Sequence, residues 1–462
     1  DNYITMNPED VATYKFLEMK RQDIDATVAT LTVNGVSAEL PVYPQPGQAK
    51  GTIGVALGYG RMLPSFKVAN GIGANAFPFL SWSNDTFQNI STDVSIAGTD
   101  KVHTFAATQI HHTIMGREEQ ILRETTLNQY RENPKSNNPE ALLQTHTGKK
   151  HVKEIDLWDG HERPNHKWGM VIDLTSCIGC GACAIACTSE NNVAVVGKDQ
   201  VMRTRDMHWL RIDRYYSSDM NKAKAHEENK GAIGMYLEME NPSNNPKVTF
   251  QPMLCQHCNH APCETVCPVL ATSHSTEGVN MMTYNRCIGT RYCANNCPFK
   301  VRRFNWYNYN DHFQHSVMNP AHEDLGRMVL NPDVVVRGRG VMEKCSLCTQ
   351  RTQAGKLAAK KAGVPLPDGS IKTACQQACP TNAITFGDAN DTESMVSKAR
   401  NDERNYYLLE ELGVKPTLSY LVKVRNQEEE ISLGEEESAT GNQPADKKKK
   451  GEKEETNEEA KG

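Results

Sequence analysis

Short apolar and β-branched runs, separated by glycine and proline, open the chain. The run "ATVATLTV" (26–33) ends at Asn34-Gly35, a pair typical of a tight hairpin, and "VSAELPVYPQPGQ" (36–48) follows it. The apolar run "TIGVALGYG" (52–60) comes next. Short strands between turns predict a small β-barrel over residues 26–57, and periodicity alone leaves a β-sandwich open.

Two longer segments follow with a different pattern. Residues 117–131, "REEQILRETTLNQYR", predict a helix, and the polar segment 132–166, with its prolines and asparagines, predicts a linker. From Asn426 onward the chain is charged and poor in aromatic residues. Such a composition cannot bury a core, so we expect residues 426–462 to be disordered unless a partner holds them.

Composition narrows the class of protein. A chain of 462 residues is long enough for two or three domains, and its 15 cysteines are an odd number with tight spacings, which favours metal sites over a disulfide framework. The net charge of −5, with both signs mixed, gives no sign of a nucleic-acid surface. No stretch has the apolar length of a transmembrane helix, and the chain opens on Asp1 without a signal-like run, so we expect a soluble piece of a longer protein.

All the cysteines lie between residues 177 and 379, in four motifs. The first, "CIGCGACAIAC", has the spacing C-x2-C-x2-C-x3-C, and the second has C-x2-C-x4-C-x3-C-P. The third repeats the first spacing with Thr290 in the second slot, and the fourth opens with C-x2-C and closes with C-x3-C-P. In chain order the motifs contain Cys177, Cys180, Cys183 and Cys187; Cys255, Cys258, Cys263 and Cys267; Cys287, Cys293 and Cys297; and Cys345, Cys348, Cys375 and Cys379.

This spacing is typical of ferredoxin iron–sulfur clusters. Three thiolates on a tight loop can reach three corners of one iron–sulfur cube, and in bacterial ferredoxins the fourth cysteine of a motif, with the proline after it, binds the other cluster of a pair. Four motifs therefore indicate two pairs, and hence four clusters. Zinc also binds CxxC pairs and remains an alternative, although a zinc site does not require the C-x2-C-x2-C-x3-C-P spacing. Covalent haem is excluded because no CxxC is followed by histidine, and His257 and His260 are expected near the second motif as supporting or surface residues rather than ligands.

The motifs resemble the four-cluster ferredoxin subunits of the dimethyl sulfoxide, polysulfide and nitrate reductase families over residues 168–390. Three phrases, "HKWGMVIDLTSCIGCGAC", "NRCIGTRYCANNCPFKVRRFNW" and "RGVMEKCSLC", are more similar to the iron–sulfur subunits of bacterial alternative complex III, a quinol oxidoreductase. In that family a molybdopterin-enzyme-like domain precedes the ferredoxin part, and residues 28–78 resemble its last, barrel-like domain. The earlier domains of that fold are absent from this chain, so no molybdenum cofactor is expected.

The resemblance also implies how the motifs pair. The first would pair with the fourth, and the second with the third. Three 4Fe–4S clusters would be bound by the sets Cys177, Cys180, Cys183 and Cys379; Cys187, Cys345, Cys348 and Cys375; and Cys255, Cys258, Cys263 and Cys297. The remaining Cys267, Cys287 and Cys293 would bind the fourth cluster.

Thr290 is then the residue that distinguishes the last site. A threonine hydroxyl stays protonated near neutral pH and is a poor iron ligand, so a 3Fe–4S cluster is expected there. Three sites with four cysteines and one with three use all 15 cysteines. A drifted residue in a vacated site is the alternative, but it would not explain why the other three ligands remain.

Positive and aromatic side chains gather around this third motif. Positive charge near a cluster stabilises its more negative, reduced form, although these cations are equally well explained as a solvated or partner-facing surface. The aromatic run 302–313, "RRFNWYNYNDHF", is typical of a core or a subunit interface, and its position makes it our candidate contact with a membrane quinone-binding subunit. The cations are Arg286, Arg291, Lys300, Arg302 and Arg303.

The sequence therefore predicts an α+β protein with a β-barrel-like remnant of a molybdopterin-oxidoreductase domain at 1–131, a linker at 132–166, a four-cluster ferredoxin-like domain at 167–425, and a charged tail. From the resemblance we expect an electron-transfer subunit, without a substrate pocket of its own, on the periplasmic side of the cytoplasmic membrane. Electrons would pass from quinol, oxidised in the membrane subunit, through the three-iron cluster toward multihaem and monohaem cytochrome c subunits. The alternatives are an electron-transfer subunit of a molybdenum reductase and a zinc-binding scaffold.

Overall fold

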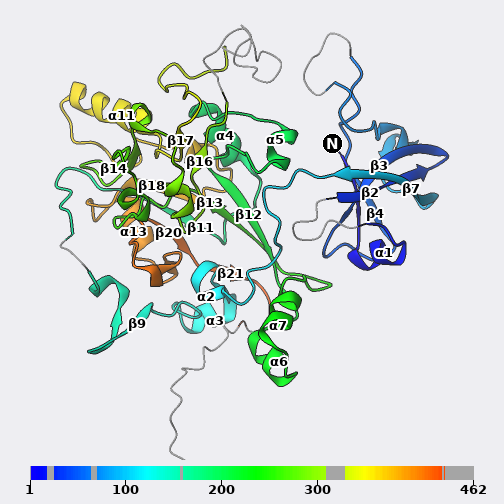
Figure 1. Cartoon of the computed structure of the whole chain (residues 1–462), viewed down its shortest axis with the longest axis horizontal. Helices are drawn as coiled ribbons and strands as arrows, with labels where there is room; N and C mark the ends of the chain where they lie inside the picture. Colours follow the sequence, from blue (N-terminus) through cyan, green and yellow to red (C-terminus); the bar gives the residue numbers. More distant parts are fainter. Residues whose placement is uncertain are drawn as a thin grey trace, which may run out of the picture.

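The structure is a computed structural model that describes residues 2–17, 25–63, 70–156, 160–307, 328–428 and 431. A β-rich N-terminal part, blue in Figure 1, lies beside a larger body coloured green to orange that contains all the cysteines. Residues 308–313 of the aromatic run and most of the predicted tail lie outside the described residues.

The N-terminal part is a five-stranded sheet in the order β4-β1-β3-β2-β7. The predicted hairpin is confirmed: Val33 pairs with Val36, and Asn34 and Gly35 have φ values of 50° and 79°, the left-handed conformation that a tight turn needs. Strands β1 and β3 are parallel, and the other pairs of this sheet are antiparallel. The strands are β1 (Ile4–Met6), β2 (Asp25–Val33), β3 (Val36–Pro44), β4 (Ile53–Val55) and β7 (Val94–Thr104).

The predicted barrel is wrong, because this sheet stays open. Within the described residues, β4 and β7 form its two edges and do not pair with each other. The buried Ala29, Leu31 and Val33 on β2 show that one face packs on a core, as the strand pattern predicts. The strand pattern does not predict whether the sheet closes into a barrel, because closure requires pairing between edge strands that are distant in sequence. The remaining elements of this part are α1 (Pro8–Thr13), η1 (Phe77–Phe79), β5 (Ser81–Ser83) and β6 (Thr86–Gln88).

The single helix predicted at 117–131 is also wrong. The segment forms α2 (Glu118–Ile121), a short strand β8 (Glu124–Thr126) and α3 (Leu127–Glu132). Strand β8 pairs in parallel with β21 (Lys423–Arg425), and the Arg425 guanidinium donates to both carboxylate oxygens of Glu124 at 2.8 and 2.7 Å. Thr126 and Gln129 form a capping box that starts α3, so a T-x-x-Q signal inside the segment marks the break.

The segment predicted as a linker contains regular structure. Strands β9 (Leu142–Thr145) and β10 (Gly148–His151) form an antiparallel hairpin, followed by η2 (Val152–Glu154). A polar composition therefore does not exclude a hairpin here.

The larger body is built around a four-stranded sheet in the order β18-β11-β20-β19 and the antiparallel pair β12 and β13. Strand β11 (Trp168–Asp173) is buried along nearly its whole length, and most of the cysteines belong to the same hydrophobic core. The other strands are β12 (Arg211–Tyr216), β13 (Val248–Met253), β14 (Thr272–His274), β15 (Asn280–Met282), β16 (Arg303–Phe304), β17 (Met342–Glu343), β18 (Ile384–Asp388), β19 (Asn405–Tyr406) and β20 (Leu418–Leu421).

Short helices connect these strands and carry many of the cysteines. They are α4 (Ala182–Glu190), α5 (Lys198–Met202), α6 (Lys222–Glu227), α7 (Ala232–Met239), α8 (Pro262–Thr265), η3 (Tyr284–Arg286), α9 (Tyr292–Asn295), α11 (Thr349–Ala362), α12 (Ala374–Gln377), α13 (Met395–Arg400) and η5 (Glu410–Leu412). In the part of the chain that the structure describes, no helix has the length and apolar character needed to cross a bilayer.

Candidate metal centres

The first cysteine group combines the first motif with the end of the fourth. Cys177, Cys180, Cys183 and Cys379 line one small cavity. The loop between the first two cysteines requires glycine: Gly179 has a φ of 69°, and a Cβ there would lie 2.3 Å from the Phe250 ring. The fold thus brings Cys379 to a loop that lies far from it in sequence.

A second group combines the fourth motif with the last cysteine of the first. Burial raises the pKa of the Cys187 thiol well above its usual range, and the neighbouring Cys345, Cys375 and Cys348 raise this pKa further. The Asn191 side-chain amide donates toward the sulfur atoms of Cys187 and Cys348 at 3.5 and 3.9 Å.

The third group combines the second motif with the last cysteine of the third. Cys255, Cys258, Cys263 and Cys297 line a small cavity. Short helix α8 carries Cys263, and Cys297 follows helix α9, which packs against α8.

Three cysteines and a threonine form the fourth group. Cys267, Cys287, Cys293 and Thr290 line one small cavity. Thr290 is exposed, as is Cys180 in the corresponding slot of the first motif. Gly289 has a φ of 74°, and a Cβ at this position would lie 2.4 Å from the carbonyl oxygen of Gly340, so only glycine fits this close approach.

The thiols fit iron–sulfur clusters in their arrangement and in the donors around them. Backbone N–H groups donate to sulfur at Cys267 (from Ala271, 3.2 Å), Cys379 (from Ala383, 3.3 Å), Cys287 (from Met342, 3.4 Å), Cys345 (from Leu347, 3.4 Å) and Cys348 (from Ala374, 3.5 Å). Such bonds stabilise thiolate charge and are one of the levers that set cluster potential. Among the described residues, no three His, Cys, Asp or Glu side chains converge closely enough to hold a single metal ion. The thiols are instead distributed around cavities.

Burial controls the protonation of most of these thiols. It raises the pKa of Cys183 to about 12 and that of Cys375 to about 11, so a positively charged metal centre would be needed to hold them as thiolates at neutral pH. At Cys267 and Cys379 burial also acts to raise the pKa, but hydrogen bonds to the sulfur outweigh it and the pKa falls below its usual range.

The four groups are neighbours in succession. Burial raises the pKa of Cys183 in the first group, and the nearby Cys375 of the second group raises it further. Burial also raises the pKa of Cys345 in the second group, as does Cys255 of the third. Arg302 connects the third to the fourth: burial lowers its pKa, but the thiolates of Cys263, Cys293 and Cys255 raise it by more.

The predicted cations separate into two kinds. Arg286 and Lys300 are exposed, Arg303 pairs with Asp206 at 3.0 Å, and Arg302 is buried with 6% of its surface exposed. Arg291 is exposed and lies over the rings of Phe304 and Trp306, at 4.9 and 5.0 Å from their centres. The two open interpretations thus apply to different residues: a surface role suits Arg286 and Lys300, and an electrostatic role suits Arg302.

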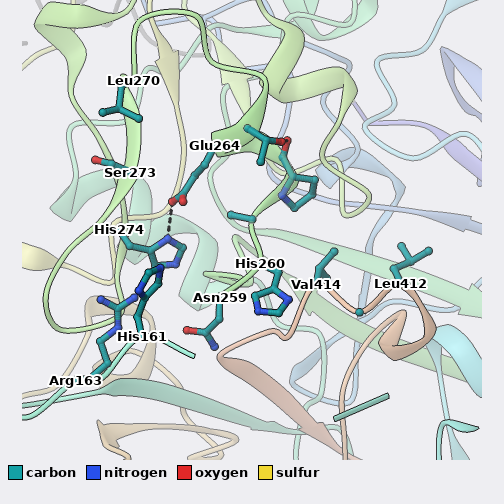
Figure 2. Close-up of a pocket in the computed structure, with 14 residues that line it drawn as sticks. His161, Arg163, Asn259, His260, Glu264, Leu270, Ser273, His274, Leu412 and Val414 are labelled. Atoms are coloured by element: carbon teal, nitrogen blue, oxygen red, sulfur yellow. Dashed lines mark hydrogen bonds and ion pairs between the residues drawn. The ribbon is translucent and has the colours of Figure 1, made fainter. Parts of the chain in front are cut away.

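The two histidines of the second motif lie outside the third cavity. His257 is buried, and its Nδ1 accepts from the backbone N–H of Asn280 at 3.1 Å. His260 lines an open cleft of about 650 Å³, drawn in Figure 2, in which the Glu264 carboxylate pairs with His274. Ala261 and Pro262 line both this cleft and the third cavity.

Sequence reasoning missed one charged residue at the centres. Lys344 is 2% exposed and lies directly before Cys345, and its ammonium group donates to the carbonyl oxygens of Asn280 and Cys345. Its place beside a cysteine motif was the available signal, but nothing in the sequence shows that it is buried.

Comparisons with known proteins agree with this geometry. Two protein-family models, each described as a 4Fe-4S dicluster domain, match residues 176–271 and 246–316. The chain is 37% identical over 259 residues to the menaquinone reductase iron–sulfur cluster-binding subunit of Nitratidesulfovibrio vulgaris, covering 55% of this chain and 88% of that protein. The chain belongs to the family of 4Fe–4S dicluster iron–sulfur subunits.

Other relatives are named for different functions. A putative dimethyl sulfoxide reductase iron–sulfur protein from Halobacterium salinarum is 33% identical over 254 residues, which cover 55% of this chain and 78% of that protein. An Hdr-like menaquinol oxidoreductase iron–sulfur protein from Archaeoglobus fulgidus is 29% identical over 275 residues, covering 56% and 84%. Members of this family are therefore named as subunits of different complexes.

Proposed function

We propose that the chain is the electron-transfer subunit of a membrane-associated complex that oxidises quinol. The observation that carries the proposal is the convergence of four distant motifs into four cysteine groups, one of which has Thr290 in place of a cysteine. Relatives named as a menaquinone reductase subunit and a menaquinol oxidoreductase subunit support quinone chemistry in the partner complex.

The four groups would serve as the ligand sets. The first, second and third would each hold a 4Fe–4S cluster, and the fourth a 3Fe–4S cluster. Bound clusters of this kind supply one-electron transfer. The chain's own residues hold the thiols at fixed separations, donate backbone N–H bonds to sulfur and keep most of the thiols from water.

The more specific parts of the proposal rest on sequence resemblance. The phrases quoted above favour a complex of the alternative complex III type, with a membrane quinone-binding subunit near the exposed Thr290 and cytochrome c subunits as acceptors, on the periplasmic side. The N-terminal sheet would be a remnant of a molybdopterin-enzyme domain, with residues 132–166 joining it to the ferredoxin-like domain.

A second candidate is an electron-transfer subunit of a molybdenum reductase. Two similarities favour it, one to the putative dimethyl sulfoxide reductase protein and one, at 31% identity over 264 residues, to a selenate reductase subunit of Mesobacillus selenatarsenatis. Both candidates use the same cysteine groups and differ in the final acceptor.

Metal analysis of the purified complex tests both. We expect roughly 15 iron atoms per chain, haem, no stoichiometric molybdenum, and a paramagnetic signal of an oxidised three-iron cluster. Stoichiometric molybdenum would favour the second candidate. Zinc in place of iron would contradict both.

A further inference from the structure

Lys344 is a buried cation between two cysteine groups. It directly precedes Cys345 of the second group, and it donates to the carbonyl oxygen of Asn280, a residue that lines the third cavity. Its charge also lowers the pKa of the Cys263 thiol in the third group, as does that of Arg302, although burial dominates and raises this pKa to about 12. The ammonium group therefore lies beside both groups.

Arg302 occupies the equivalent place between the next two groups. It lines the third cavity, and its Nη2 donates to Thr272 Oγ1 at 2.8 Å and lies 3.3 Å from Met282 Sδ. Thr272 and Met282 both line the cavity of the fourth group. The guanidinium group is thus shared by the walls of two cavities.

Neither cation has a carboxylate partner within 4 Å in the described ranges of the chain. The buried Arg337 does have one: Arg337 and Glu343, each 1% exposed in their side chains, lie 2.9 Å apart. A buried charge is strongly unfavourable unless an opposite charge compensates it. Cysteines lie beside both cations: Lys344 directly precedes Cys345, and Arg302 lines the third cavity together with Cys263 and Cys297.

We propose that Lys344 and Arg302 are the internal counter-charges of the metal centres, Lys344 between the second and third and Arg302 between the third and fourth. Each raises the reduction potentials of the two centres beside it, because a fixed cation stabilises the more negative, reduced form. The effect is strong because water, which screens exposed charges, is excluded from both positions. The inference rests on the proposed ligand sets and goes beyond them by naming two residues that tune neighbouring centres together.

The test is a redox titration of the purified complex, followed by electron paramagnetic resonance, for Lys344→Met and Arg302→Met. We expect the second and third centres to become harder to reduce in Lys344→Met, and the third and fourth in Arg302→Met. A tenfold change in the reduction equilibrium would appear as a shift of about 59 mV for one electron. The first centre should keep its potential in both variants and serves as an internal reference.

Exposed lysines near the same cysteines provide matched controls. Lys300→Met removes a cation two positions before Arg302, and Lys372→Met removes one three positions before Cys375. Both side chains lie in water, so the potentials should stay unchanged. Equal shifts in the control and test variants would overturn the proposal, since they would show a general effect of net charge.

If either Met variant loses a cluster, the iron content of the charge-conserving variants Lys344→Arg and Arg302→Lys is measured next. Recovery of iron in these charge-conserving variants would support the counter-charge role, whereas continued loss would show that side-chain shape is what matters and overturn it. Full iron content with unchanged potentials in the Met variants would overturn it as well. A wild-type complex without iron–sulfur clusters would instead refute the proposed function.

Discussion

At the residue scale, the exchange of one sulfur for one hydroxyl distinguishes the fourth cysteine group from the other three. Thr290 lines the cavity with Cys267, Cys287 and Cys293, in the slot that Cys180 occupies in the first motif. The backbone of the surrounding loop is similar in the two motifs, because Gly289 and Gly179, at the position before each slot, have the same left-handed conformation. The missing thiolate, rather than a different backbone, thus sets this group apart.

We predict that Thr290→Cys converts the three-iron cluster to a 4Fe–4S cluster. A thiolate at this slot would complete the ligand set, so the paramagnetic signal of the oxidised three-iron cluster should disappear and one more iron should bind per chain. Quinol oxidation should slow, because the added iron lowers the potential of this centre. Thr290→Ser, which keeps a hydroxyl, should behave as wild type. A Cys variant that keeps the three-iron signal would mean that Thr290 does not mark the vacant corner.

At the element scale, helix α12 and the turn after it divide neighbouring cysteines between two groups. Cys375 lies on α12 and belongs with Cys187, whereas Cys379, four residues later, lines the first cavity. Thr373 caps the helix, and its hydroxyl lies 3.3 Å from the Cys375 sulfur. The short helix therefore orients one thiol toward each group.

Cys379→Ser should damage the cluster bound by Cys177, Cys180 and Cys183 and spare the others. The matched variant, Cys375→Ser, should damage the cluster of Cys187, Cys345 and Cys348 instead. Spectra of the separate centres would distinguish the two losses. If both variants lost the same cluster, the pairing between the first and fourth motifs would be refuted.

At the scale of the whole molecule, the end of the described chain returns to the segment before the ferredoxin core. Strand β21 pairs with β8, and beyond it the backbone N–H of Ile431 donates to Gln129 Oε1 at 3.2 Å. The Ile431 carbonyl oxygen accepts from Gln129 Nε2 at 3.0 Å and from Asn137 Nδ2 at 2.5 Å. The prediction of disorder from Asn426 onward is thus wrong at Ile431, which these hydrogen bonds hold in place, and residues 432–462 lie outside the described residues.

Two truncations should separate these parts of the tail. Removal of residues 432–462 should leave both the melting temperature and the iron content unchanged, because that composition cannot pack a core. Removal of everything after Asn426 should also keep the iron, but it should lower stability by about 1–2 kcal/mol through loss of the Ile431 hydrogen bonds. Loss of iron in either truncation would show that the tail supports the metal centres.

The sequence by itself determined the local features of this protein. Cysteine spacing defines the four motifs because a loop of two-residue spacers is a local structure, and Asn34-Gly35 predicts its hairpin because the turn needs only its own residues. The T-x-x-Q capping signal at Thr126 is also local, but the helical propensity of residues 117–131 predicted one continuous helix. The structure has a break there, because β8 pairs with β21.

The tertiary structure decided what depends on distant segments meeting. The grouping of Cys379 with Cys177 came from resemblance rather than from spacing, and the structure brings the two together where β18 and β11 pair in the central sheet. The open edge of the N-terminal sheet and the burial of Lys344 and Arg302 were likewise beyond local pattern. Strand pairing and burial depend on residues that are distant in sequence, so local spacing does not predict them.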